Sequence, residues 1–269
     1  MKTNNAQPIG IFDSGIGGLT VASAIHQWMP QESLVYYGDT AHLPYGDKSK
    51  ELIAEFALRI TRFLLEEKKC KAIVIACNTA SAAAYEPLRD QYKGIIPVIN
   101  VIDPMIEAVI ADTDIHRLGI IATKTTVASG VYQEKLSRRK PSLPYAALAT
   151  PLLASMIEEG FYDNSVSHEV LKAYLGDPQL ADIDALVLAC THYPLIKKEI
   201  DQYYGGRVKL FDSAQVVAQK LHHILNKEQM NHEGPAGQNE FFVSDYTLAF
   251  EEATRIFFKT SVKLQKMPL

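Results

Sequence analysis

Two of the three cysteines in this 269-residue sequence stand in closely matched segments. Residues 72–79 (AIVIACNT) and 185–192 (ALVLACTH) each run from apolar residues into Ala-Cys and then a polar pair. A cysteine at the end of a buried strand is most often a small apolar residue, and buried strands use few residue types, so chance is one reading of the match. Two cysteines in equivalent positions favour the other reading, in which Cys77 and Cys190 are a pair of thiols that exchange protons with a ligand.

Each of these cysteines precedes an expected helix N-terminus. The partial positive charge there lowers a thiol pKa toward neutrality, so we expect thiols that act as acid or base. His192 could assist Cys190, and Asp13, at the end of another expected strand, could assist Cys77. A purely structural histidine is an equal alternative. Cys70 lies among lysines without such a strand end, and we interpret it as a bystander.

The elements that must position these groups are short apolar runs that alternate with amphipathic segments such as 49–68. Continuous apolar strands separated by helices indicate parallel sheets that are covered on both faces, so the sequence predicts an α/β protein. The strands are expected at Ile9–Asp13, Leu34–Gly38, Ala72–Cys77, Pro97–Val101, Leu118–Ala122, Tyr145–Ala149, Ala185–Cys190 and Val208–Phe211.

The separation of the two cysteines predicts the domain organisation. The number of residues between them is about the length of one doubly wound domain, which indicates two similar domains. Each domain would then have a cysteine at the carboxyl end of a strand, where open α/β sheets bind ligands. A second echo, between 12–15 (FDSG) and 211–214 (FDSA), suggests that the chain returns to its first domain there. We therefore expect a first domain of 1–99 plus 212–269 and a second of 100–211, with Asp212 or Ser213 as the N-cap of a helix.

Two loops could contact a ligand. Residues 13–18 (DSGIGG) connect a strand to a helix over 19–28, and their backbone N–H groups could bind a carboxylate or a small anion. A dinucleotide fingerprint is excluded because Thr20 replaces its third glycine. Residues 38–46 (GDTAHLPYG) are either a surface turn or a loop that offers the backbone of Tyr45 and Gly46 to a ligand.

The composition and charge of the chain argue against some classes of binding partner. The net charge of −4 and the pI near 6.1 argue against a nucleic-acid-binding protein, which needs a basic face. No apolar stretch approaches the roughly 20 residues that span a bilayer, and the first residues, MKTNNAQP, lack an apolar signal core. An odd number of cysteines without disulfide spacing indicates reduced thiols. We expect a cytoplasmic protein without a membrane partner.

Four segments together resemble the glutamate racemases of the aspartate/glutamate racemase superfamily: 9–21 (IGIFDSGIGGLTV), 36–49 (YYGDTAHLPYGDKS), 74–82 (VIACNTASA) and 188–195 (LACTHYPL). The resemblance implies two α/β domains with the active site between them, no cofactor, metal or nucleotide, and a homodimer that supplies D-glutamate for peptidoglycan. It also implies that Cys77 and Cys190 exchange the α-proton of glutamate. Glu158 matches a glutamate near the family's site, although Glu159 beside it leaves that assignment open. The residues that the resemblance implies hold the substrate are Asp13, Ser14, Tyr45, Gly46, Asn78, Thr79, Thr191 and His192.

Four alternatives remain. Aspartate racemases of the same superfamily typically carry Glu where this chain has His192, which favours glutamate. A cysteine hydrolase needs one nucleophile and leaves the second cysteine unexplained. A metal site of Cys77, Cys190 and His192 lacks the short Cys-x-x-Cys spacing of structural zinc sites. A module that only binds an anion or amino acid would keep its affinity without either thiol.

Overall fold

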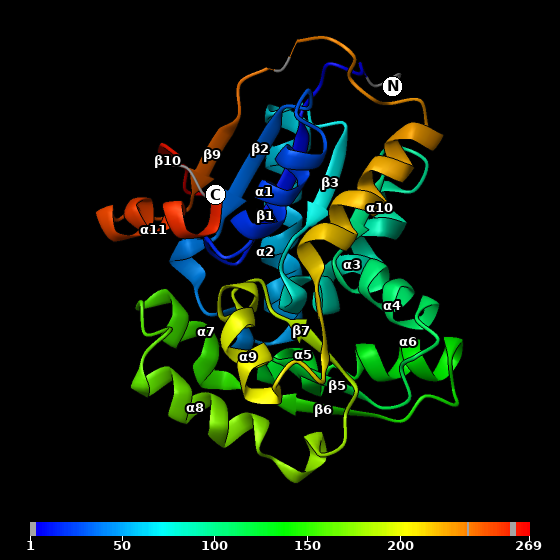
Figure 1. The fold of residues 1–269 in the computed structure, drawn as a ribbon. Coiled ribbons are helices and arrows are strands. Elements are labelled where there is room, and N and C mark those ends of the chain that lie inside the picture. The colour runs from blue at the N-terminus through cyan, green and yellow to red at the C-terminus, as the bar shows by residue number, and fades with distance from the viewer. Residues whose placement is uncertain (1–3, 236, 259–261) are drawn as a thin grey trace.

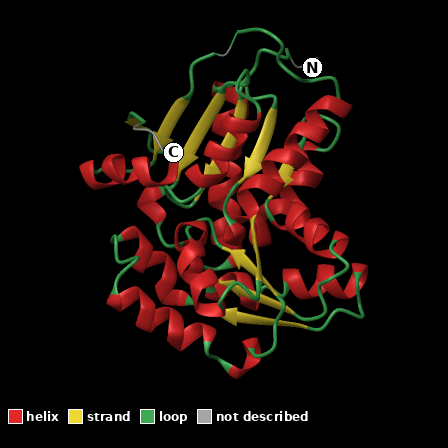
Figure 2. Ribbon diagram, in the orientation of Figure 1, coloured by secondary structure: helices red, strands yellow, loops and turns green. Residues whose placement is uncertain are grey.

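The computed structural model describes residues 4–235, 237–258 and 262–269, which form two parallel β-sheets with helices on their faces (Figures 1 and 2). The first sheet has the strand order β10-β9-β2-β1-β3-β4 and the second has β6-β5-β7-β8. The two sheets lie one above the other in Figure 1, with β1, β2 and β3 above β5, β6 and β7. The predicted α/β class with two parallel sheets is confirmed.

The strand bounds show how regular the sheets are. Every pairing in both sheets is parallel. The first sheet consists of β1 (Ile9–Asp13), β2 (Leu34–Gly38), β3 (Ala72–Ile75), β4 (Val98–Asn100), β9 (Glu240–Val243) and β10 (Leu264–Lys266). The second consists of β5 (Leu118–Ala122), β6 (Tyr145–Ala149), β7 (Ala185–Ala189) and β8 (Lys209–Asp212).

The two sheets repeat one topology. The order β2-β1-β3-β4 in the first sheet has the same connectivity as β6-β5-β7-β8 in the second. Cys77 follows the third strand of one repeat and Cys190 follows the third strand of the other, so the match between their segments reflects equivalent positions. The FDSG and FDSA segments, by contrast, end β1 and β8, which are not equivalent strands.

The helices cover the sheets and connect the strands. Helix α2 shows why these segments are helical, because Ile53, Phe56, Ala57 and Ile60 are buried at a spacing of three and four residues and Ser49 caps its first turn. A π-helical turn over Phe63–Glu67 follows it. The helices are α1 (Leu19–Trp28), α2 (Lys50–Arg62), α3 (Asn78–Tyr92), α4 (Ile102–Ala111), α5 (Lys124–Ala128), α6 (Val131–Arg139), α7 (Pro151–Glu158), α8 (Ser165–Leu175), α9 (Lys197–Tyr204), α10 (Ser213–Lys227) and α11 (Leu248–Phe258).

Helix α10 connects the two halves of the molecule, of which one contains the first sheet and the other contains the second sheet. It starts directly after β8 of the second sheet, with Asp212 as its N-cap accepting from the N–H of Ala214, and it packs against α1 and α4. One apolar core consequently runs from the first sheet to the second and includes Ile11, Leu221 and Val187. The expectation of a cap at Asp212 or Ser213 is confirmed for Asp212.

Most predicted strands agree with the structure to within one or two residues, but β9 and β10 were not predicted. Both are short, three or four residues long, and they extend the first sheet beyond β2. Among the described residues, no helix is both long and apolar enough to cross a membrane.

Candidate active site

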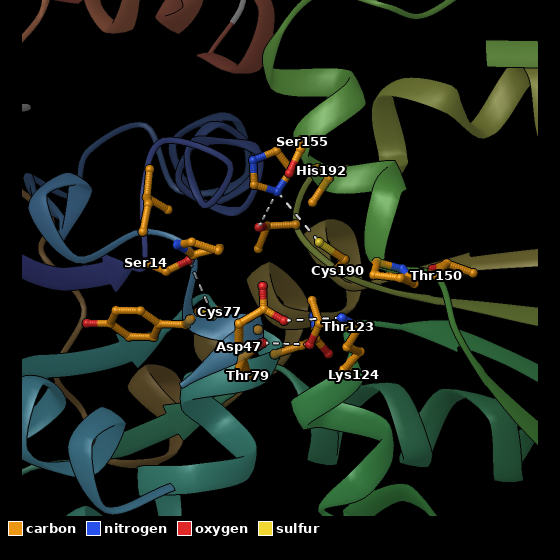
Figure 3. A pocket seen from close by; sticks show the side chains of 18 of the residues that line it. Ser14, Asp47, Cys77, Thr79, Thr123, Lys124, Thr150, Ser155, Cys190 and His192 are labelled. Atoms are coloured by element: carbon orange, nitrogen blue, oxygen red, sulfur yellow. Dashed lines mark hydrogen bonds and ion pairs between the residues drawn. The ribbon is translucent and has the colours of Figure 1, made fainter. Parts of the chain in front are cut away.

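A cavity of about 80 Å³ lies where the carboxyl ends of the strands of both sheets face each other (Figure 3). It is far smaller than the roughly 300–1,000 Å³ that drug-sized ligands occupy, which favours a small ligand. The half of the molecule that contains the first sheet contributes Ser14, Leu43, Pro44, Tyr45, Gly46, Asp47, Cys77, Asn78 and Thr79 to its lining. The second half contributes Thr123, Lys124, Thr150, Pro151, Ala154, Ser155, Glu158, Ala189, Cys190, Thr191 and His192.

Cys77 enters the cavity from the first half. It is the N-cap of α3, its Sγ accepts from the backbone N–H of Ala80 at 3.4 Å, and its thiol lies 3.7 Å from Oγ of Ser14. Only 5% of the residue is exposed. The predicted placement at a strand end and a helix N-terminus is confirmed.

The expected effect of that helix on the Cys77 thiol is wrong. Burial raises its pKa to about 12, the Asp13 carboxylate adds to the rise, and the N–H of Ala80 opposes it without compensating. Loss of hydration disfavours the thiolate more than the helix N-terminus favours it. Cys77 is therefore a protonated thiol at neutral pH in the ligand-free protein.

Cys190 enters from the second half, at the end of β7, and it is linked to His192. Nδ1 of His192 lies 3.6 Å from Sγ of Cys190. The α-helix expected directly after Cys190 is absent, because the chain first makes a 3₁₀ turn over Tyr193–Ile196 and α9 begins only at Lys197. The partner of this sulfur is thus an imidazole and not an α-helix N-terminus.

Glu158 completes this arrangement. Its Oε1 lies 2.8 Å from Nε2 of His192, whereas Glu159 is exposed at the end of α7, so the structure decides between the two glutamates. Burial disfavours the imidazolium, but hydrogen bonds to Cys190 and Glu158 outweigh it, so the pKa of His192 lies well above its usual value. The ring of Phe257, on α11, contacts His192 edge-on at 5.6 Å between centroids.

Asp13 is completely buried and does not line the cavity. Its Oδ2 accepts from the N–H groups of Gly15 and Gly18, at 3.1 and 3.0 Å. Those N–H groups of the glycine loop therefore bind the chain's own carboxylate, where we expected a ligand anion. Burial raises the pKa of Asp13, and the charge of His192 opposes the rise.

The remaining predicted residues all line the cavity. Thr79 forms a hydrogen bond between the two halves, in which its Oγ1 lies 2.9 Å from Oγ1 of Thr123. The hydroxyl of Tyr45 donates to Oδ2 of Asp39 at 2.6 Å, which leaves its backbone to contact a ligand. The other lining residues that the sequence predicted are Ser14, Gly46, Asn78 and Thr191.

Sequence reasoning missed several lining residues. Thr123 and Thr150 are the first residues after β5 and β6. The cysteines were predicted because ligands bind at the carboxyl ends of parallel strands, and the same rule could have identified both threonines. Lys124 and Asp47, which lie 3.6 Å apart across the two halves, carried no such signal. In the part of the chain that the structure describes, no group of three or more His, Cys, Asp or Glu side chains is arranged to hold a metal ion.

Comparison with known proteins identifies the family. The family model for Asp/Glu/Hydantoin racemase matches residues 16–221. The chain belongs to this family. The glutamate racemase of Geobacter metallireducens is 42% identical over 243 residues, which are 90% of this chain and 89% of that protein. The family resemblance drawn from the four motifs is confirmed.

Solved structures agree with this assignment. The glutamate racemase of Francisella tularensis, solved in complex with D-glutamate, is 35% identical with a TM-score of 0.91 over 98% of each chain. Glutamate racemase RacE1 of Bacillus anthracis is 34% identical with a TM-score of 0.93 over 99% of each chain. The activity that these relatives share with the chain is that of a glutamate racemase, an amino-acid isomerase with two α/β domains.

Proposed function

We propose that Cys77 and Cys190 interconvert L-glutamate and D-glutamate by acting as acid and base on opposite sides of the α-carbon. The single observation that carries this proposal is that two cysteines from equivalent strands of the two halves line one small cavity. Racemisation needs a base on one face of the α-carbon and an acid on the other. A topological repeat whose halves face each other supplies that arrangement.

In the direction from L-glutamate, the Cys190 thiolate removes the α-proton and the Cys77 thiol delivers its own proton to the other face. The return reaction reverses both transfers. The imidazolium of His192, 3.6 Å from Sγ of Cys190, stabilises negative charge on that sulfur. Because Cys77 keeps its proton at neutral pH, the ligand-free protein is set to accept L-glutamate.

The site must also stabilise the carbanion-like transition state. Donors that are fixed in place before the reaction do this at no reorganisation cost when charge develops on the substrate. We propose that Ser14, Asn78, Thr79 and Thr191 surround the α-carboxylate and that the backbone of Tyr45 and Gly46 contacts the distal carboxylate. We propose that Asp13 assists Cys77 without contacting the substrate, because its charge raises the pKa of that thiol and it does not line the cavity.

The family resemblance extends these proposals. We assign 1–99 with 212–269 to one domain and 100–211 to the other; the return of α10 to pack on α1 and the membership of β9 in the first sheet support this division. We also propose a cytoplasmic homodimer that supplies D-glutamate for peptidoglycan. Light scattering of the purified protein tests the dimer.

The decisive experiment is incubation with L-glutamate in heavy water without added cofactor, followed by NMR and optical rotation. D-glutamate carrying deuterium at the α-carbon is the expected product. The aspartate racemase alternative predicts comparable kcat/KM on aspartate, whereas a pocket that pairs a distal carboxylate leaves its donors unsatisfied by the shorter substrate.

The thiols are tested individually. Cys77→Ala and Cys190→Ala should each abolish racemisation in both directions, because both groups act on both paths. Each variant should still eliminate a β leaving group from the enantiomer that faces its remaining thiol. Cys70→Ser, at a buried position outside the cavity, is the control and should keep full activity. Substantial racemisation by both alanine variants would overturn the two-thiol mechanism.

A further inference from the structure

The side-chain amide of Asn78 is held in one orientation. Asn78 is the first residue of α3, directly after Cys77, and it lines the cavity with only 3% of its surface exposed. Its Oδ1 accepts a hydrogen bond of 2.9 Å from the hydroxyl of Tyr132. Its Nδ2 has no hydrogen-bond partner among the described residues. A buried amide N–H₂ without a partner is costly, so a ligand acceptor is expected there.

Tyr132 comes from the other half of the molecule. It lies on α6, which follows β5 of the second sheet, and it is 96% buried. Burial raises its pKa above the usual value for tyrosine, so its hydroxyl stays protonated at any working pH and remains a donor. Asn78 is the one hydrogen-bond partner of this hydroxyl among the described residues, so its proton has an acceptor only when the carbonyl oxygen of the amide faces it. With the N–H₂ group there instead, the phenol oxygen would accept from the amide and the buried O–H would be left without an acceptor.

We infer that Tyr132 is a positioning residue, which turns the Asn78 amide so that its N–H₂ group faces a carboxylate of the substrate. This inference rests on the proposed function, in which Asn78 binds glutamate next to Cys77. Without the hydroxyl, the amide is free to rotate by half a turn and to present its oxygen to the carboxylate, which repels it. Because the two residues belong to opposite halves, the donor is oriented only when the halves are packed together.

Tyr132→Phe tests the inference, since it removes the hydroxyl and keeps the ring. A hydrogen bond to a charged group is stronger than one between neutral groups, so an amide that is oriented only part of the time should raise KM for both enantiomers about tenfold. The value of kcat should fall less than threefold. The matched control is Tyr145→Phe, because Tyr145 and Tyr132 line one separate cavity in the second half, whereas the hydrogen bond to Asn78 comes from Tyr132. It should leave KM unchanged.

A double-mutant cycle separates positioning from a structural role. Measured as kcat/KM from α-deuteration followed by NMR, which detects slow turnover, Tyr132→Phe should have no further effect in an Asn78→Ala background. Additive losses would overturn the inference. So would an unchanged KM in Tyr132→Phe, with or without a lower melting temperature. Racemisation by the unaltered protein tests the proposed function separately, so that failure of one is not mistaken for failure of the other.

Discussion

Nε2 of His192 lies 2.8 Å from Oε1 of Glu158, and the opposite nitrogen of the same ring faces Sγ of Cys190. The carboxylate is thus separated from the sulfur by one imidazole. A carboxylate hydrogen-bonded to one ring nitrogen fixes the orientation of the ring and favours the imidazolium, in which the other nitrogen also carries a proton. Glu158 therefore acts on the proposed base through His192.

Glu158→Gln should lower kcat for L-glutamate about 10- to 100-fold at neutral pH, within the range of a positioned acid–base group. The pKa of His192 is raised by Glu158, and the imidazolium is lost as pH rises through that pKa. Removing the carboxylate lowers the pKa of His192, so the alkaline limb of the pH–kcat profile should move to lower pH. Glu159→Gln, an exposed neighbour, is the control. An unmoved alkaline limb in Glu158→Gln would show that the contact plays no part in catalysis.

Gly17, in the glycine loop, lies close to the side chains of His192 and Thr191. A Cβ at this position would lie 2.5 Å from Cε1 of His192 and 2.8 Å from Oγ1 of Thr191. Gly17→Ala should therefore displace both side chains and lower kcat/KM about 100-fold, since a small misplacement of reacting groups is that costly.

A matched overpacking control lies in the core of the second half. A Cβ at Gly119 would lie 2.8 Å from Cδ1 of Ile183 and 2.9 Å from Cδ1 of Leu186. Gly119→Ala should lower the free energy of unfolding about as much as Gly17→Ala, by roughly 1–3 kcal/mol, but keep the kcat/KM of the unaltered protein. Equal activity in the two variants would mean that the site tolerates displacement of His192.

The sequence was informative where a local pattern determines the structure. Strands such as β1 and β5 are continuous apolar runs bounded by turn residues, and their bounds were predicted to the residue. The short β9 and β10 form because they pair with strands already present in the first sheet, which no local pattern reveals. Ten of the predicted site residues line the cavity because each follows a strand or belongs to a motif, and Asp13 is the exception.

Properties that depend on tertiary packing could not be predicted. The pKa of Cys77 follows from its burial, which outweighs the helix N-terminus that the sequence does reveal. The contact between Tyr132 and Asn78 joins residues 54 positions apart in different halves. Thr123 directly follows β5, but threonine, unlike cysteine, is not among the usual acid–base side chains, so its position alone did not indicate a role.

A buried ion pair outside the cavity should affect stability alone. Lys71 is fully buried, and its Nζ lies 2.6 Å from Oε2 of Glu32 and donates to the carbonyl oxygens of Asn5 and Met230. Burial lowers the pKa of Lys71, and Glu32 opposes that. Lys71→Met should reduce the free energy of unfolding by about 3–5 kcal/mol, because it leaves the Glu32 carboxylate buried without a cation.

Lys71 lies just before β3, and Cys77 lies beyond the opposite end of that strand. Because Lys71 is at the end of β3 away from the cavity, KM for glutamate should not change. The control is Lys69→Met, at an exposed lysine two residues away, which should change stability by less than about 0.5 kcal/mol. Urea unfolding measures both. A loss below about 1 kcal/mol in Lys71→Met would mean that Glu32 finds another partner or becomes protonated.

The raised pKa of Cys77 predicts how its alkylation depends on pH. Only the thiolate reacts, and with a pKa of about 12 the thiolate fraction rises about tenfold for each pH unit below that value. In a Cys70→Ser background, the rate of iodoacetamide modification at Cys77, mapped by peptide mass spectrometry, should therefore climb from pH 7 to 10 without a plateau. D-glutamate should slow it throughout, because Cys77 lines the cavity. A plateau near pH 8 would instead mean that the N-terminus of α3 outweighs burial, and the ligand-free protein would no longer hold Cys77 as the proton donor for L-glutamate.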